Sequence, residues 1–165
     1  MSASGAPRAS QGLHLVVPRL RSPREQHVSA CRILDANVNR ALEGLRVCED
    51  ITRFHVLSPV LFRRVRALRH ELALVTRRVP GYPCTLLWRR ASARDPGRRA
   101  PAVPVASLER LLLVNFQRAK EALRTLEECS RLIAPRQTAA FQQLRFRTYE
   151  VERALVLRVA SVRHR

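Results

Sequence analysis

Two segments of the chain carry amide, guanidinium and carboxylate side chains in the same order and at the same spacing. The first set is Asn37, Arg40, Glu43 and Arg46. The second set, at a constant offset of 78, is Asn115, Arg118, Glu121 and Arg124. Between the segments 37–50 and 115–128, seven of the fourteen positions are identical. A period this long that occurs twice indicates a duplicated unit, and repeated polar residues point to a role beyond packing.

These residue types suit the binding of phosphate groups. At 100° per residue, Asn37, Arg40 and Gly44 lie along one line at the flank of a helix. The planar guanidinium of arginine binds phosphate oxygens with two hydrogen bonds, and a small neighbour lets a ligand or another backbone approach closely. Gly44 and its counterpart Ala122 also fit a contact between crossing helices, and both interpretations stay open. If the copies dock around a twofold axis, we expect Arg40 and Arg118 to face one common cleft.

A second polar row runs along each copy, opposite the apolar side. Its carboxylates and arginines stand three or four residues apart, as ion pairs on a helix surface do, and each pair adds only about 0.2–0.5 kcal/mol. We therefore interpret the row as mainly a solvated face. The row comprises Asp35, Asn39, Glu43, Arg46, Asp50 and Arg53 in the first copy and Gln117, Glu121, Arg124, Glu128 and Arg131 in the second.

Several common kinds of active site are missing from the sequence. It contains no GxxxxGK[ST] or GxGxxG loop and no His/Cys cluster with metal-ligand spacing. Its four cysteines form no CxxC pair, which favours reduced thiols in a cytoplasmic protein. Phosphoryl chemistry would therefore depend on arginines and carboxylates projected from helices, with magnesium held by one or two carboxylates and the substrate phosphates.

The chain has a net charge of +18, and lysine supplies only one of its 31 basic residues. Clustered arginine binds polyanions, so a nucleic-acid-binding helical bundle is one alternative function. So complete a preference for arginine also fits a compositional bias that fills surfaces with arginine. Because one Trp and two Tyr offer little surface for stacking bases, we favour bias over a nucleic-acid partner. No apolar stretch is long enough to predict a membrane span.

Apolar residues recur at three- and four-residue steps in four stretches, and each stretch predicts an amphipathic helix. The predicted helices run from about Ala30 to Phe54, from Ser58 to before Pro80, from Ser107 to Pro135 and from Thr138 onward. The expected buried stripes are Leu34, Val38, Ala41, Leu45 and Cys48; Leu61, Val65, Leu68, Leu72 and Val75; Leu112, Phe116, Ala119, Leu123 and Leu126; and Phe141, Leu144, Val151 and Leu155.

This pattern predicts an all-α fold in which two duplicated helical hairpins, related by pseudo-twofold symmetry, form approximately a four-helix bundle. We expect a disordered lead-in over 1–28 and one helical domain over 29–165. Within it, repeat one spans about 30–78, a long Pro- and Arg-rich connection spans 79–106, and repeat two spans about 107–160. The second helices match at an offset of 79, with Phe62 against Phe141. Cys84–Trp88 is expected to be a short extended piece.

The segment Arg32–Asp50, the segment Leu68–Leu72 and the second copy of the motif at 115–128 together resemble a known helical domain. That domain occurs alone or in front of some thiamine-phosphate synthases, and its family is associated with a hydroxymethylpyrimidine-phosphate kinase. The resemblance covers about residues 30–155. It implies transfer of the ATP γ-phosphoryl group onto 4-amino-5-hydroxymethyl-2-methylpyrimidine phosphate, with ATP and Mg²⁺ as cofactors. The product would be the diphosphate used to assemble thiamine.

The resemblance also implies roles for the repeated polar residues. Arginines would contact phosphate groups, asparagines would orient the substrate, and carboxylates would hold magnesium or the substrate hydroxyl. The expected substrate- and phosphate-binding residues are Arg32, Asn37, Arg40, Arg46, Arg69, Asn115, Arg118 and Arg124. The expected catalytic residues are Asp35, Glu43 and Glu121, of which Asp35 and Glu43 are also the expected magnesium ligands.

Two features depart from the family pattern. After Arg94-Asp95, the segment 96–100 replaces an Asp-Val-Gly turn, and so loses an acidic residue and a glycine that could hold metal or phosphate. A relative that binds the ligand or regulates the pathway, but has lost catalysis, is therefore a further alternative. The synthase barrel is also absent, so we expect the protein to act alone or with a separate thiamine-phosphate synthase.

Overall fold

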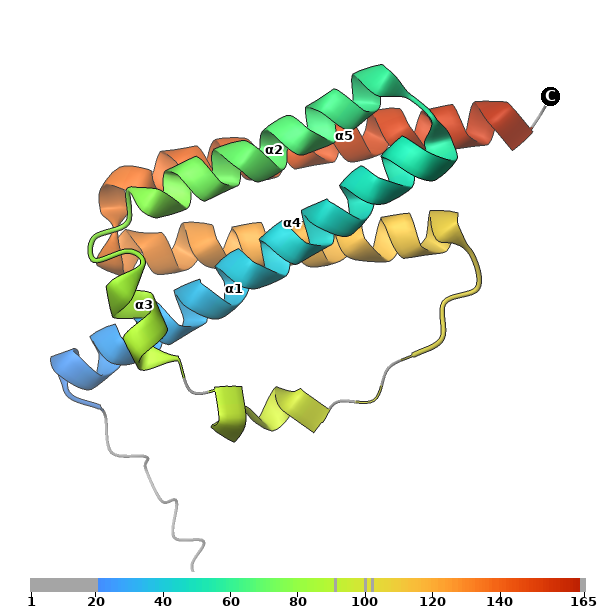
Figure 1. Cartoon of the computed structure of the whole chain (residues 1–165). Coiled ribbons are helices and arrows are strands. Elements are labelled where there is room, and N and C mark those ends of the chain that lie inside the picture. The colour runs from blue at the N-terminus through green and yellow to red at the C-terminus, as the bar shows by residue number, and fades with distance from the viewer. Residues whose placement is uncertain (1–20, 91, 100, 102, 164–165) are drawn as a thin grey trace, which may run out of the picture.

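The computed structural model describes residues 21–90, 92–99, 101 and 103–163, and its regular elements are helices (Figure 1). They are α1 (Pro23–Ile51), α2 (Pro59–Arg77), α3 (Cys84–Arg89), α4 (Leu108–Ile133) and α5 (Thr138–Arg163). Because these described residues contain no strand, the predicted all-α class is confirmed. None of the helices described is both long and apolar enough to cross a lipid bilayer.

Serine side chains begin three of the long helices. Ser22 accepts a hydrogen bond from the Glu25 N–H, and the Glu25 carboxylate accepts one from the Ser22 N–H, which forms a capping box. Ser58 and Ser107 cap α2 and α4 in the same way, each accepting from a backbone N–H three residues ahead. Each such cap contributes about 1 kcal/mol. The predicted starts of α2 and α4 are thus confirmed.

Three boundaries differ from the prediction. The capping box starts α1 at Pro23, so residues 23–28, which we assigned to a disordered lead-in, are helical; residues 1–20 lie outside the described part. At its other end α1 stops at Ile51 and passes into a π-helical turn, Thr52–Val56. Cys84–Trp88 is not extended but helical, because Pro83 stands at the N-cap of α3 and its fixed φ suits a helix start.

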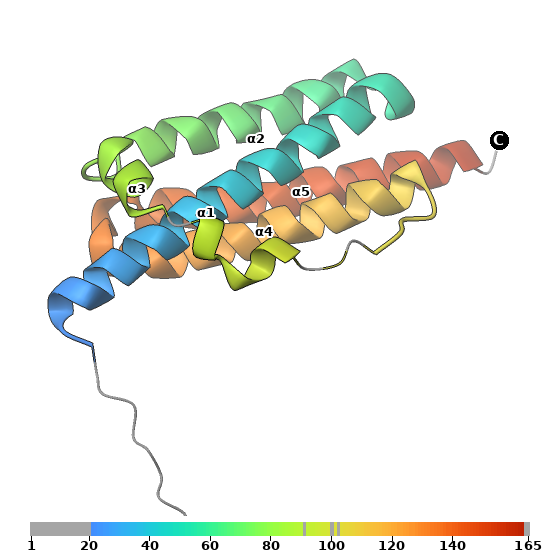
Figure 2. The ribbon, with the colours of Figure 1, turned by 60° about the horizontal axis from the view of Figure 1, so that its bottom comes forward.

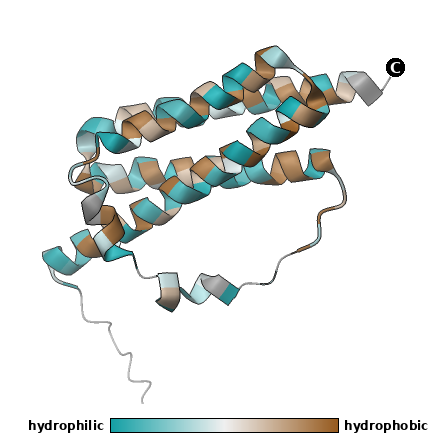
Figure 3. Ribbon diagram, viewed as in Figure 1, coloured by the Kyte–Doolittle hydropathy of each residue, from teal (hydrophilic) through white to brown (hydrophobic). Residues whose placement is uncertain are grey.

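The four long helices pack as two layers, with α1 and α4 in one and α2 and α5 in the other (Figures 1 and 2). Each hairpin, α1–α2 and α4–α5, is antiparallel and contributes one helix to each layer. Apolar and polar residues alternate along every helix (Figure 3). All residues of the four predicted stripes are buried, so the core lies between the layers as expected.

The first layer is held by a close crossing of α1 and α4. A Cβ atom added to Gly44 would lie only 2.9 Å from the carbonyl oxygen of Asn115 and 3.6 Å from the Cβ of Ala119. Ala41, one turn before Gly44, is fully buried, as is Ala119. The interpretation of Gly44 as a helix-crossing residue is therefore confirmed. Ala119, which Gly44 approaches, is the counterpart of Ala41, so the crossing involves the same part of the repeat in both copies.

The second helices of the two copies, α2 and α5, match at a different sequence offset from the one predicted. Glu49 and Glu127, which match at an offset of 78, bind Arg69 of α2 and Arg145 of α5, so these arginines are counterparts at an offset of 76. At an offset of 76, most buried residues of α2 fall on buried residues of α5, whereas an offset of 79 would set buried Leu68 against exposed Arg147. The predicted offset of 79 is therefore wrong. The change of offset from 78 to 76 means that the first copy has two more residues than the second between matched positions of its two helices, and the π-helical residues Thr52–Val56 lie in that part of the chain.

Candidate functional site

A hollow of about 710 Å³ lies between the polar side of α1 and the connection that follows α3. The connection runs along the layer formed by α1 and α4 (Figure 2), and its residues Arg90, Ser92 and Asp95 line the hollow. Five of the eleven predicted site residues line it from α1: Arg32, Asp35, Asn37, Arg40 and Glu43. Because they recur at two- to three-residue steps on one helix, they line the hollow along a continuous strip of that helix's surface.

Two consecutive arginines fasten the connection to α1. Arg90 donates two hydrogen bonds to Asp35, from Nε at 2.7 Å and from Nη2 at 2.6 Å, and hydrogen bonding to Asp35 raises the pKa of Arg90. One turn earlier on α1, the thiol of Cys31 accepts a hydrogen bond from Arg89 at 3.2 Å. Asp35 is only 7% exposed, so its predicted place on a solvated face is wrong, because Arg90 covers it.

The repeated asparagine positions the repeated arginine in the first copy. Asn37 is buried; its Nδ2 donates to the carbonyl oxygen of Ile33 at 2.8 Å, and its Oδ1 accepts from Nη1 of Arg40 at 3.0 Å. Asn115 makes the same bond to the carbonyl of Leu111, also at 2.8 Å. The Arg40 guanidinium is thereby held at the hollow by one N–H, which leaves its other donors available to a ligand.

The hollow also contains charged groups without protein partners. Within the described part of the chain, the side chains of Arg32 and Glu43 are exposed and make no hydrogen bond or ion pair. Asp95 accepts only the N–H of Gly97, at 2.8 Å. Two guanidinium groups, those of Arg32 and Arg40, and two carboxylates, those of Glu43 and Asp95, therefore remain to meet a ligand.

Arg46 and Arg69, two of the predicted phosphate-binding residues, instead surround a buried carboxylate. Glu49, with a side chain 4% exposed, accepts a hydrogen bond from Nε of Arg69 at 2.6 Å and lies 3.6 Å from Nη1 of Arg46. Arg46 also pairs with Asp50 at 3.1 Å. We call Arg46, Glu49 and Arg69 the first ion cluster. It joins α1 to α2, and the hollow lies elsewhere on α1.

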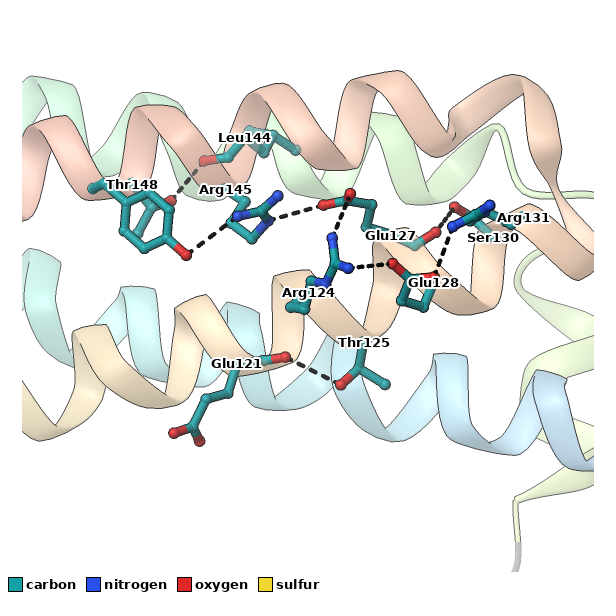
Figure 4. Close-up of polar contacts among 11 residues, drawn as sticks. Glu121, Arg124, Thr125, Glu127, Glu128, Ser130, Arg131, Leu144, Arg145 and Thr148 are labelled. Carbon is teal, nitrogen blue, oxygen red and sulfur yellow. Dashed lines mark hydrogen bonds and ion pairs between the residues drawn. The ribbon is translucent and has the colours of Figure 1, made fainter.

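The second copy repeats this arrangement, as Figure 4 shows. Glu127 is buried between Arg124, at 2.8 Å, and Arg145 of α5, also at 2.8 Å. Arg124 reaches the carboxylate of Glu128 as well, at 2.7 Å. Hydrogen bonds to Tyr149 and to Glu127 raise the pKa of Arg145. Arg124, Glu127 and Arg145 form the second ion cluster, so the third arginine predicted to bind phosphate also binds a carboxylate.

Arg118 does not share the large hollow with Arg40. It lines a smaller one of about 320 Å³ together with Arg110, Leu113, Val114, Gln117 and Glu152. All of these lining residues except Glu152 have a counterpart in the first copy that lines the large hollow. In the same order as Arg110, Leu113, Val114, Gln117 and Arg118, the counterparts are Arg32, Asp35, Ala36, Asn39 and Arg40. The single common cleft that we expected is therefore replaced by two matched hollows, one in each copy.

Within the described residues, Glu121 and the expected magnesium ligands do not come together in one metal-binding site. The Glu121 carboxylate accepts a hydrogen bond from Gln117 at 2.8 Å. Glu121 also lines a further hollow, together with Lys120, Arg124 and Tyr149. Among the described residues, no group of three or more His, Cys, Asp and Glu side chains could hold a metal ion.

Most of the chain is similar to a known protein family. Residues 32–154, which are most of the chain, match the ThiD2 family. The chain belongs to the ThiD2 family. The match contains the strip of α1 that lines the large hollow, the connection, both ion clusters and the second hollow. The family resemblance noted in the sequence is confirmed at this level.

Relatives of this ThiD2 chain are named thiamine-phosphate synthases. The one from Nostoc sp. (strain PCC 7120) is 38% identical over 128 residues, which is 76% of this chain and 35% of the relative. The one from Rhodopirellula baltica is 34% identical over 144 residues, 81% of this chain and 36% of the relative. The chain thus spans about a third of the length of these relatives. No solved structure matches it.

Sequence reasoning missed two residues of this ThiD2 chain that matter to the site. Arg90, which holds Asp35, looked like one of the surplus surface arginines, because the connection has no periodic pattern that could place it. The wrong offset matched Arg145 with Arg66, although Leu144-Arg145 repeats Leu68-Arg69. That shared dipeptide was the signal that could have identified the second ion cluster.

Proposed function

We propose that this ThiD2-family chain acts in thiamine biosynthesis as an ATP-dependent kinase of hydroxymethylpyrimidine phosphate. The bond between the γ-phosphorus and its bridging oxygen to ADP breaks, and a phosphate oxygen of the acceptor forms a new bond to that phosphorus. The products are ADP and the pyrimidine diphosphate. A thiamine-phosphate synthase would consume the diphosphate. The relatives named as thiamine-phosphate synthases support the pathway.

The observation that carries the proposal is the pair of guanidinium groups in the large hollow. Arg32 and Arg40 have no carboxylate partner among the described residues, although carboxylates bind several other arginines of the bundle. Phosphoryl transfer requires positive charge around the phosphoryl oxygens and little covalent chemistry from the protein. The volume of about 710 Å³ lies within the range of small-molecule sites.

The donor groups of the hollow fit magnesium only in the company of substrate phosphates. Asp35 is occupied by Arg90, so the available carboxylates are those of Glu43 and Asp95. Magnesium is usually bound by one or two carboxylates together with phosphate oxygens and water. When bound, the ion would offset negative charge on the phosphates. Glu43 and Asp95 would hold it, while Arg32 and Arg40 bind phosphate oxygens directly.

The test is formation of the diphosphate from ATP and the pyrimidine phosphate by purified protein with magnesium, followed by ³¹P NMR. We expect Arg40→Lys to lower kcat/KM at least about tenfold, because lysine keeps the charge but loses the two-pronged geometry. Arg131→Lys is the matched control, since Arg131 binds only the exposed carboxylate of Glu128. Lack of turnover in folded wild-type protein would exclude the kinase.

A binding or regulatory role without catalysis is the second candidate. It is favoured by the occupied carboxylate of Asp35 and by the changed segment after Asp95. It predicts that calorimetry detects the pyrimidine phosphate while the kinase assay detects no product. Restoring an Asp-Val-Gly turn in place of residues 98–100 should then raise activity, and failure to gain any would count against this candidate.

A further inference from the structure

The two matched hollows are lined by equivalent residues of α1 and α4, and the second is also lined by Glu152 of α5. A twofold axis that exchanges two antiparallel helices runs perpendicular to both, so matched residues stay on one face of the pair. The five matched lining positions of the hollows obey this symmetry. The duplication has therefore produced two related surfaces, and among the described residues those of the connection line only the first.

The second hollow has the same pair of cations as the first. Arg110 and Arg118 are eight residues apart, as Arg32 and Arg40 are, which is about 12 Å along a helix. Within the described part of the chain, neither guanidinium makes a hydrogen bond or an ion pair. Glu152, which also lines this hollow, is bound through both carboxylate oxygens by Lys120, at 2.7 and 2.8 Å. The net charge that meets a ligand there is positive.

The lining of the second hollow is more apolar than that of the first. Leu113 stands where the first copy has Asp35, and Val114 stands where it has Ala36. The hollow is also less than half as large, about 320 against 710 Å³. It thus combines two phosphate-binding cations with apolar side chains and room for a small ring. A nucleoside triphosphate is larger and suits the first hollow better.

We infer that the second hollow binds the pyrimidine phosphate, through Arg110 and Arg118, while the first binds the nucleotide. This inference rests on the proposed function. Arg40 and Arg118 stand directly before Ala41 and Ala119, the residues at the helix crossing, so the hollows approach each other there. Each then extends along its own helix, in opposite directions, toward Arg32 or Arg110. The phosphate groups of the two ligands would meet at the crossing, where one phosphoryl group can pass between them.

The first test uses inorganic pyrophosphate and does not depend on the substrates. Calorimetry should give two sites per wild-type chain and one site in the double variant Arg110→Gln/Arg118→Gln. The matched double variant Arg32→Gln/Arg40→Gln should also retain one site. Unchanged circular dichroism and Tm would show that these exposed substitutions leave the fold intact. A single site in the wild type that persists in the Arg110/Arg118 variant overturns the inference.

The second test separates the two ligands, with ADP and the pyrimidine phosphate titrated into each single variant. Arg110→Gln should weaken binding of the pyrimidine phosphate about tenfold and change ADP binding less than about twofold, and Arg32→Gln should do the reverse. If Arg110→Gln leaves the pyrimidine phosphate unaffected in a protein that turns over, the inference fails and the kinase stands. If the two variants separate the binding of ADP and of the pyrimidine phosphate in this way but the protein shows no turnover, the assignment of one ligand to each hollow is supported. The proposed kinase activity is then excluded.

Discussion

The two copies of the repeat agree in their ion clusters and differ in their hollows. In each copy a buried glutamate, Glu49 or Glu127, lies between an arginine of its own helix and one from the following helix. These clusters join the helices of each hairpin, so their repetition reflects folding. The hollows diverge, because only Asp35 of the first copy has a carboxylate for Arg90 of the connection, whereas the second copy has Leu113. The two copies thus share the structural ion pairs and differ in the residues that line their hollows.

The largest predicted effect on stability concerns the ion clusters, which the two copies share. Glu49→Ala and Glu127→Ala should each lower the free energy of unfolding by about 3 kcal/mol, because each removes a buried carboxylate together with its charge-assisted contacts to two arginines. Urea denaturation followed by circular dichroism measures both values. Similar losses would support structural equivalence of the clusters. Glu128→Ala is the control, since its carboxylate is 42% exposed and an exposed pair contributes at most about 1 kcal/mol.

The next effect concerns the crossing, where the copies are not identical. Gly44→Ala should destabilise the protein by about 1–3 kcal/mol, because its Cβ would lie 2.9 Å from a backbone oxygen of α4 that cannot move freely. The counterpart Ala122 already has a Cβ, so Ala122→Gly should cost only about 1 kcal/mol, through helix propensity. Thermal unfolding compares the two. Equal Tm values for Gly44→Ala and wild type would contradict the close crossing.

Much of this architecture could be read from periodicity, because burial follows helical spacing. The four stripes, the capping serines Ser58 and Ser107 and the role of Gly44 all depend on local sequence, and all were predicted. Arg90 and Asp35 are 55 residues apart, and Arg90 lies in an aperiodic segment, so their contact depends on the tertiary path of the connection. The offset between α2 and α5 depends on the length of the segment that joins the two helices of each copy, which contains a π-helical turn in the first copy, and this length leaves little trace in a sequence.

A smaller effect tests whether the connection builds the first hollow. Asp35→Leu copies the second repeat's residue into the first and frees Arg90. Because the Arg90 side chain is 41% exposed and can be solvated, stability should fall by no more than about 1 kcal/mol. Nucleotide affinity should fall about tenfold, since Asp95 and its neighbours would no longer be held over α1. Calorimetry with ADP measures this, and unchanged affinity would show that the connection does not contribute to the site.

The smallest effect comes from the reciprocal change, Leu113→Asp, which gives the second copy a carboxylate at the matched position. No connection covers this position, so the new aspartate cannot gain a partner like Arg90. Its nearest helical neighbour on the same face is Arg110, three residues earlier, and a pair at that spacing is worth about 0.2–0.5 kcal/mol. Stability, measured by urea denaturation, should therefore change very little.

Binding should respond to Leu113→Asp more than stability does. The pyrimidine phosphate should bind a few-fold more weakly in calorimetry, because the carboxylate would occupy Arg110 and repel the phosphate. Raising the ionic strength should reduce this difference, since the hollow is open to screening by salt. If Leu113→Asp instead strengthened nucleotide binding, the second hollow would be an incomplete copy of the first, and the assignment of one ligand to each would be wrong.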